Sequence, residues 1–186
     1  MGFTTSTFKQ NINRAIKKAS EGSTADFSES TFEAYGFAGA SFVINVLTDN
    51  NNRATSDVRV AVCKNGGKMA EQGSVIFMYD RKGRIEVESE LEEEALLDAA
   101  IEAGVDDFEL VEGDEEVTSV VFTQPSDVAQ MSEAIKGMGK TCKFSLAFVT
   151  KAPVEVPDED FENNMKIFDA LMELDDVDSV EHNMAN

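Results

Sequence analysis

Residues 34–83 read AYGFAGASFVINVLTDNNNRATSDVRVAVCKNGGKMAEQGSVIFMYDRKG, and this stretch decides the fold. Every second residue from 40 to 46 is apolar, which predicts a strand buried on at least one face. A polar turn at 48–53 leads into a helical pattern that two glycines, Gly66 and Gly67, bring to an end. We predict a second strand at 74–79, a turn at 80–83, and binding residues at the polar ends of this strand–helix–strand unit. The inward residues are Ala40, Phe42, Ile44 and Val46 on the first strand, and Ala54, Val58, Ala61 and Val62 on the helix.

Length and composition place the chain among globular proteins of one or two domains. Of its 186 residues 42% are apolar, so it can bury a substantial core. No run of about 18 apolar residues is present and the start shows no secretory signal pattern, so we predict no membrane partner. Two cysteines are too few for a disulfide framework or a cysteine-based zinc site, and we expect Cys63 and Cys142 to be buried thiols.

Charge is distributed unevenly along the sequence. The net charge is −20, which argues against nucleic acid as a partner of the whole surface. Residues 1–84 carry 11 basic and 8 acidic groups, whereas residues 85–186 carry 5 basic and 28 acidic groups. We therefore expect a polyanion to be attracted by the first half and repelled by the second. In a simpler interpretation, the acidic half only keeps the protein in solution.

The rest of the chain predicts two domains, one inserted in the other. Residues 84–150 show the order strand, helix, strand, strand, helix, strand, which is the split βαβ signature of a ferredoxin-like domain. A helix at 158–174 and a strand at 177–181 have no partner of their own, so we expect them to return to the sheet of residues 28–83. The fold class is α/β (α+β), with two two-layer α/β domains, one of them ferredoxin-like and inserted in the other. The predicted domains are 1–27 (a remnant helix of a basic domain, and a linker), 28–83 plus 151–186 (discontinuous) and 84–150 (the acidic insertion).

The sequence lacks the patterns of common catalytic and cofactor sites. His182 is the only histidine and lies near the end of the chain, which disfavours a catalytic role. Neither a GxGxxG nor a Walker pattern occurs, and the acidic run at 158–160 lacks the loop glycine and the terminal glutamate of a calcium site. We therefore predict a protein that is not an enzyme and that holds no cofactor or metal.

Basic residues near the polar turn are the candidate binding groups. Asp49 or Asn50 is explained as the cap of the following helix, but capping does not explain Arg53 or the pair Arg81 and Lys82. A helix predicted at 8–20 has one basic face, which is either a solvated surface or a contact for a nucleic-acid backbone. The predicted nucleic-acid-binding residues are Lys9, Arg14, Lys17, Lys18, Asn52, Arg53, Arg59, Lys68, Arg81 and Lys82, with Lys64 close to them.

An ordered series of short motifs resembles the YebC/PmpR family, which includes the mitochondrial translational activator of cytochrome c oxidase. The likeness is dense from about residue 9 to residue 83, weak in the acidic middle, and present again near the end. The motifs are NINRAIKK at 11–18, Tyr35-Gly36 with Gly39, LTDNNNR at 47–53, KNGG at 64–67, GSV at 73–75, Lys82-Gly83 and VEHN at 180–183.

The resemblance implies a basic helical N-terminal domain followed by two α/β domains, the last inserted in the second. Of the basic domain only the last helix is recognisable, and the family's glycine- and proline-rich loop carries Phe37 and Ala38 in place of the usual pair. The resemblance implies a cytoplasmic protein if the chain is bacterial, or one of the mitochondrial or plastid matrix if it is eukaryotic.

Three functions remain open from the sequence. The first, which we favour, is a ribosome-associated translational activator that contacts ribosomal RNA or tRNA through the basic face of residues 9–84. A DNA-binding transcriptional regulator is the second, and it requires a preference for particular duplex sequences. The third is a module that binds a small molecule in the cleft between two domains.

Overall fold

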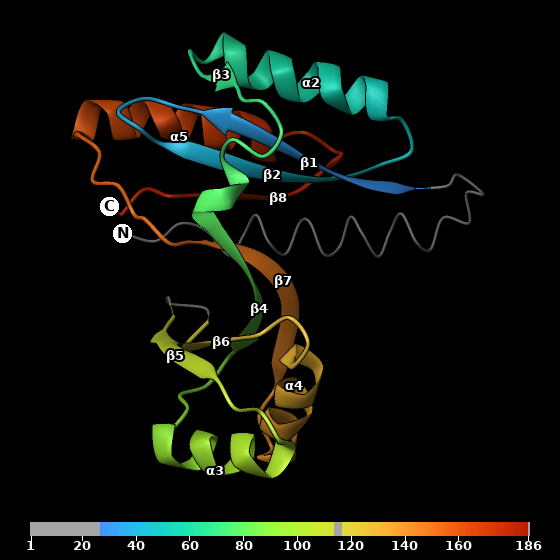
Figure 1. The fold of residues 1–186 in the computed structure, drawn as a ribbon, viewed down its shortest axis with the longest axis vertical. Coiled ribbons are helices and arrows are strands. Elements are labelled where there is room, and N and C mark those ends of the chain that lie inside the picture. The colour runs from blue at the N-terminus through green and yellow to red at the C-terminus, as the bar shows by residue number, and fades with distance from the viewer. Residues whose placement is uncertain (1–26, 114–116, 186) are drawn as a thin grey trace. The chain divides into compact units, whose positions relative to one another are not determined.

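The computed structural model describes residues 27–113 and 117–185, which form two compact units (Figure 1). We call residues 27–80 with 149–185 the discontinuous unit, and residues 81–148 the inserted unit. The chain passes between them within strand β4 (Tyr79–Val87) and near the end of strand β7 (Cys142–Thr150). The helix predicted at 8–20 lies outside the described residues.

A four-stranded antiparallel sheet forms the centre of the discontinuous unit. Its order is β3-β1-β2-β8, so the final strand of the chain pairs with a strand near its start. The two-residue edge strand β3 was not expected from the sequence. The strands are β1 (Ser28–Tyr35), β2 (Ser41–Thr48), β3 (Lys68–Met69) and β8 (Val177–His182).

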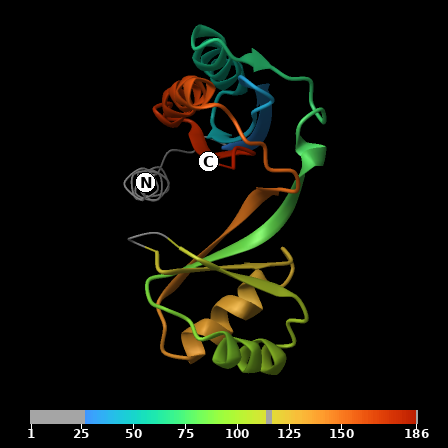
Figure 2. The same ribbon diagram turned by 90° about the vertical axis from the view of Figure 1, so that its left-hand side faces the viewer.

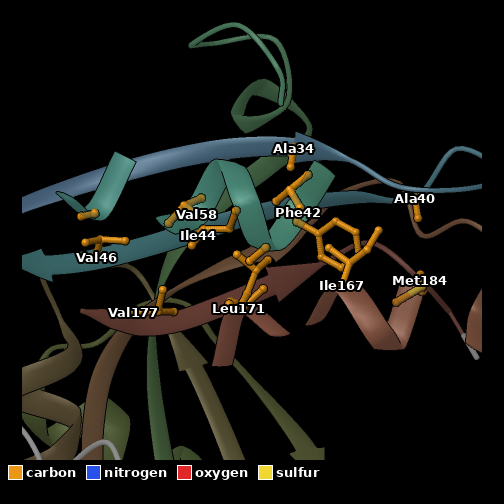
Figure 3. Packing of buried hydrophobic residues seen from close by; sticks show 14 of the residues in the cluster. Ala34, Ala40, Phe42, Ile44, Val46, Val58, Ile167, Leu171, Val177 and Met184 are labelled. Carbon is orange, nitrogen blue, oxygen red and sulfur yellow. The ribbon is translucent and has the colours of Figure 1, made fainter. Parts of the chain in front are cut away.

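Two helices, α2 (Asn51–Lys64) and α5 (Asp158–Met172), cover one face of this sheet and close its core (Figure 3). The predicted alternation in β2 is confirmed, because Phe42 and Ile44 are fully buried and pack in one cluster with Val58, Ile167 and Leu171. Burying one such large apolar side chain contributes about 1.5–3 kcal/mol. These apolar contacts therefore fix the positions of both helices on the sheet.

The start, end and buried stripe of α2 agree with the pattern predicted from the sequence. The Asn50 side chain accepts the backbone N–H of Arg53 at 3.1 Å, which caps the first turn. Gly66 has a φ of +87°, a backbone conformation that residues with a Cβ adopt rarely, and α2 ends just before this glycine. One expectation is wrong: Cys63 is exposed, because it lies on the outer side of the helix.

The segment after β3 differs from the strand predicted at 74–79. A 3-10 turn, η1 (Ile76–Met78), is followed directly by β4, so the predicted turn at 80–83 lies within a strand. The reason is the buried carboxylate of Glu33, which accepts backbone N–H groups of this segment that a strand would use for pairing. The segment covers the second face of the sheet, where Val43, Val75 and Tyr79 are buried.

The inserted unit has the ferredoxin-like arrangement that the sequence predicted. Its sheet order is β5-β6-β4-β7, and its core joins Ile85 and Val121 of the sheet to Leu96, Met131 and Ile135 of the helices. The helices α3 and α4 lie side by side in this unit (Figure 2). Its remaining elements are α3 (Glu93–Ala103), β5 (Phe108–Glu112), β6 (Ser119–Thr123) and α4 (Val128–Gly137).

The fold redistributes the charge that the sequence separates. The discontinuous unit and the inserted unit each contain 17 acidic and 6 basic residues, a net of −11 for each. The expected separation of a basic first half from an acidic second half does not carry over to the two units, because the segment 149–185, which contains α5 and β8, returns 11 acidic residues to the first sheet. In the part of the chain that the structure describes, no helix is long and apolar enough to cross a membrane.

Candidate nucleic-acid interface

The predicted binding residues lie in two different units. Asn52, Arg53 and Arg59 belong to α2, and Lys68 forms part of β3 in the same discontinuous unit. Arg81 and Lys82 belong to β4 of the inserted unit. The residues predicted on the first helix, Lys9, Arg14, Lys17 and Lys18, lie outside the described residues. The structure therefore does not unite the described candidates on one domain, and each has to be considered in its own surroundings.

Arg53 is held by two carboxylates. Its guanidinium lies 2.7 Å from Asp49 and 2.9 Å from Asp176, and Asp176 also accepts the Thr48 hydroxyl. Hydrogen bonding to Asp176, and then to Asp49, raises the pKa of Arg53 above its usual value. Arg53 thus joins the start of α2 to the turn before β8, which is the structural explanation that helix capping alone did not provide.

The cations of β4 are largely balanced by neighbouring acids. Lys82 lies 3.0 Å from Glu109 and 5.8 Å from the centre of the Phe122 ring, which is within the range of a cation–π contact. Arg84 pairs with Glu86 at 3.0 Å. Arg81 is exposed and makes no ion pair with a described residue. Of the two predicted β4 residues, only Arg81 offers an uncompensated charge.

Besides Arg53, three cations on α2 and β3 are exposed: Arg59, Lys64 and Lys68, which we call the α2–β3 cations. None of them forms an ion pair with a residue that the structure describes. Arg59 lies about 140° around the helix from Lys64, at 100° per residue, so these two cations lie on different parts of the outer side of α2. Lys64 is in the last turn, where a positive charge also favours the helix dipole. Acids outnumber bases 17 to 6 in this unit, so cations without an acidic partner on two elements that contact each other are unusual there.

A rigid turn lies beside these cations. Two buried asparagines hold the connection between β1 and β2, and each of them bonds both a backbone N–H and a backbone carbonyl. Asn164 of α5 accepts from Phe37 N at 2.8 Å and donates to Phe37 O at 3.2 Å. Asn183 accepts from Ser41 N at 2.8 Å and donates to Gly39 O at 3.3 Å. These side-chain amides hold the backbone on both sides of Ala38, the exposed tip of the turn, which has a left-handed conformation with a φ of +52°.

The turn at 36–40 and the end of α2 are in contact. A Cβ added to Gly66 would come within 2.6 Å of the Phe37 ring, so these two segments pack directly together. Gly36 is equally constrained, because a Cβ there would collide with the side chain of Asn164. This end of the unit therefore combines a fixed backbone turn with Lys64 and Lys68, an arrangement suited to contacting a polyanion backbone.

Catalytic chemistry finds little support in the described residues. The Nδ1 atom of His182 accepts the backbone N–H of Met184 at 3.3 Å, and its ring lies edge-on to Phe168. Burial lowers the pKa of His182, so its neutral form is favoured. Over residues 27–113 and 117–185, no group of three His, Cys, Asp or Glu side chains could hold a metal ion.

Sequence reasoning missed the side chains that shape the site. Glu33, Asn164 and Asn183 are all at least 96% buried, although they are polar. The pattern of α5 contained a signal for one of them, because Asn164 lies three and seven residues before Ile167 and Leu171, at the centre of the buried stripe. A polar residue inside an apolar stripe indicates a specific hydrogen-bonding partner.

The fold and the site define a two-unit α/β protein with a ferredoxin-like insertion and no recognisable catalytic centre in its described part. Comparison with known families gives a match to the second and third domain of TACO1/YebC over residues 27–184. The chain therefore belongs to the TACO1/YebC family, as the motifs in its sequence had indicated.

Several relatives and one solved structure agree with this membership. A protein of Chlamydia felis and one of Protochlamydia amoebophila, both named probable transcriptional regulatory protein, are 38% and 41% identical over 178 residues. The match covers 95% and 94% of this chain, and 74% and 71% of these relatives. The crystal structure of a conserved hypothetical protein from Aquifex aeolicus is similar with a TM-score of 0.76 and 34% identity, over 95% of this chain and 72% of that one.

Proposed function

We propose that this chain is a non-enzymatic regulator of gene expression that associates with the ribosome and activates translation by contacting RNA. The relatives support the broader part of this proposal, because their names describe regulators and not enzymes. The observation that carries the RNA contact is the set of α2–β3 cations, which stay unpaired in a unit with a net charge of −11. Phosphate contacts by Lys and Arg supply most of the sequence-independent affinity for nucleic acid.

Electrostatics favour a ribosomal site over free duplex DNA. A long duplex would meet the acidic remainder of both units as well as the small cationic surface, and repulsion would oppose close approach. A folded RNA surface can present a few phosphates to the α2–β3 cations while the acidic surfaces stay in solvent. The α2–β3 cations can therefore contact a few phosphates of a folded RNA, but they are too few to bind along an extended duplex.

Co-sedimentation with purified ribosomes tests the proposal. The variant Arg59→Gln/Lys64→Gln/Lys68→Gln removes the three charges, and Lys136→Gln/Lys140→Gln/Lys143→Gln removes the same charge from the inserted unit as a matched control. We expect the first variant to sediment at least about tenfold more weakly at low salt, and the control to sediment like the unaltered chain. Equal sedimentation of the two variants would contradict the assigned surface.

A second candidate function is transcriptional regulation through DNA. The names of the Chlamydia felis and Protochlamydia amoebophila relatives favour it. This function requires that the chain prefer some duplex sequences to others, because phosphate contacts alone carry no sequence information. Selection of duplex DNA from a random library distinguishes the two functions: an enriched motif without ribosome binding would establish the second at the expense of the first.

A further inference from the structure

Phe77 is the most exposed aromatic side chain among the described residues, with 65% of its surface accessible. It lies in the middle of η1 in the discontinuous unit, and Figure 1 shows this short green coil leading into β4. A single exposed apolar residue is common on protein surfaces and by itself indicates nothing. What sets Phe77 apart is the rigid backbone that carries it.

The buried carboxylate of Glu33 holds the backbone that leads into the turn. The Glu33 side chain, 4% exposed, accepts the backbone N–H groups of Gly73 at 2.5 Å, Val75 at 2.6 Å and Ile76 at 2.9 Å. On the other side of Phe77, Met78 donates its N–H to Val75 and accepts from the N–H of Lys151. The backbone on both sides of the exposed ring is therefore held by hydrogen bonds, and little conformational entropy remains to be lost when a partner contacts the ring.

A second aromatic ring, Tyr35, bonds to the segment just before the turn, and one of the α2–β3 cations is its cross-strand neighbour. The Tyr35 hydroxyl donates to the Ser74 carbonyl at 3.0 Å, and 37% of Tyr35 is exposed. Tyr35 is the direct cross-strand partner of Lys68, so their Cβ atoms are about 5 Å apart on one face of the sheet. Ser74 and Phe77 are three residues apart, which limits the distance between their Cα atoms to about 11 Å. Tyr35 and the unpaired Lys68 therefore lie close to the segment that carries Phe77.

We infer that Phe77 and Tyr35 form a stacking platform for unpaired nucleotides of single-stranded RNA, with Lys68 contacting the adjoining phosphate. Aromatic rings that hold successive bases beside a cation on the backbone are the usual means of binding single strands. Bases inside an RNA duplex are already stacked, so the platform selects loops, bulges and ends. This inference rests on the proposed contact with RNA and names the form of RNA that is recognised.

Fluorescence anisotropy with a labelled single-stranded 12-nucleotide RNA and a matched RNA duplex tests the platform in the full chain. We expect Phe77→Ala to weaken single-strand binding by about 5- to 150-fold, which corresponds to the loss of one stacked base. The slope of log affinity against log salt should stay unchanged, since no phosphate contact is lost. By contrast, Lys68→Gln should reduce that slope by about 0.7 for the one phosphate it contacts.

Two controls separate a binding effect from loss of structure. Phe144→Ala removes another exposed aromatic ring, 52% accessible, from the inserted unit, and we expect it to bind like the unaltered chain. Phe77→Ala should unfold at the same urea concentration as the unaltered chain, because exposed substitutions change stability by about 0.5 kcal/mol or less.

The outcomes distinguish this inference from the function on which it rests. If Lys68→Gln weakens RNA binding while Phe77→Ala binds like the unaltered chain, the stacking platform is refuted and the RNA contact stands. Equal affinity of the unaltered chain for the single strand and the duplex also refutes the platform. If the unaltered chain binds neither RNA, both the platform and the proposed function are overturned.

Discussion

The most direct test of the structure is the substitution Glu33→Gln, which removes one negative charge and changes almost no volume. In the folded chain the carboxylate accepts three backbone N–H groups, from Gly73, Val75 and Ile76. A glutamine has one acceptor oxygen instead of two. If this oxygen stays on Val75 and Ile76, the new NH2 group faces the N–H of Gly73, so two donors meet and one hydrogen bond is lost.

The size of the effect follows from this geometry. Loss of a hydrogen bond to a charged acceptor costs about 1.5–3 kcal/mol, and the two remaining bonds weaken when the acceptor becomes neutral. Relief of the desolvation of a buried charge acts in the opposite direction. We therefore expect the free energy of unfolding of the discontinuous unit to fall by about 2–3 kcal/mol.

Tyrosine fluorescence during urea unfolding measures this change selectively. The chain has no tryptophan and only two tyrosines, Tyr35 and Tyr79, both in the discontinuous unit. With a urea dependence of about 1–1.5 kcal/mol per molar, the unfolding midpoint should fall by about 1.5–3 M with an unchanged slope. The matched control is Glu29→Gln, an exposed glutamate of the same strand whose side chain makes no hydrogen bond with a described residue. A Glu33→Gln midpoint equal to that of the control would refute the role assigned to the carboxylate.

Three further predictions concern the same unit. Asn164→Ala should lower the free energy of unfolding by about 2–4 kcal/mol, because it leaves the N–H and carbonyl of Phe37 without partners. The control is Asn163→Ala, which removes a partly buried asparagine of the same helix whose side chain bonds only to Lys166; equal unfolding midpoints of the two variants would contradict the role of Asn164. Burial raises the pKa of Tyr79 to about 12. The contribution of the neutral tyrosine to the free energy of unfolding should therefore be complete below pH 10 and should fall by up to about 2.7 kcal/mol as the pH rises to 12. Tyr79→Phe should abolish this alkaline loss, and an unchanged loss would assign it elsewhere. Burial lowers the pKa of His182. Its neutral form therefore contributes to the stability of the folded chain above about pH 6.5, and this contribution is lost as the pH falls through the pKa of the folded state. NMR titration of this single histidine should show a midpoint below about 6.5, and a higher midpoint would contradict its burial.

Periodicity predicted most of the secondary structure because it records contacts within one element. The alternation in β2 and the stripe of α2 identify buried residues correctly, and the order of elements in the inserted unit identified its ferredoxin-like arrangement. The prediction failed at 74–79, where the residues are compatible with a strand. Glu33, 40 residues earlier in the chain, binds their backbone instead, and no local pattern records such a partner.

The candidate site was predicted less completely than the fold. The sequence pointed to the basic residues near the polar turn, but it could not tell which of them are compensated or that Arg81 and Lys82 belong to the other unit. The sequence presented Arg53 as a cation that could bind a phosphate, but the fold places Asp176, 123 residues later, against its guanidinium. The sequence pattern predicted a strand for Phe77, and only the structure shows that this residue is exposed on a turn whose backbone is held by hydrogen bonds to Glu33.

The sequence by itself determined the family, the types and order of most of the elements, and the insertion of one unit in the other, because these depend on local patterns and on ordered motifs. The tertiary structure alone decided where the charge lies. Strand pairing between β2 and β8 returns the acidic end of the chain to the first sheet, so a separation of charge along the sequence becomes two equally acidic units. The reason is physical: electrostatic compensation depends on distance in space, and pairing of β2 with the last strand brings together charges that lie more than a hundred residues apart, such as those of Arg53 and Asp176.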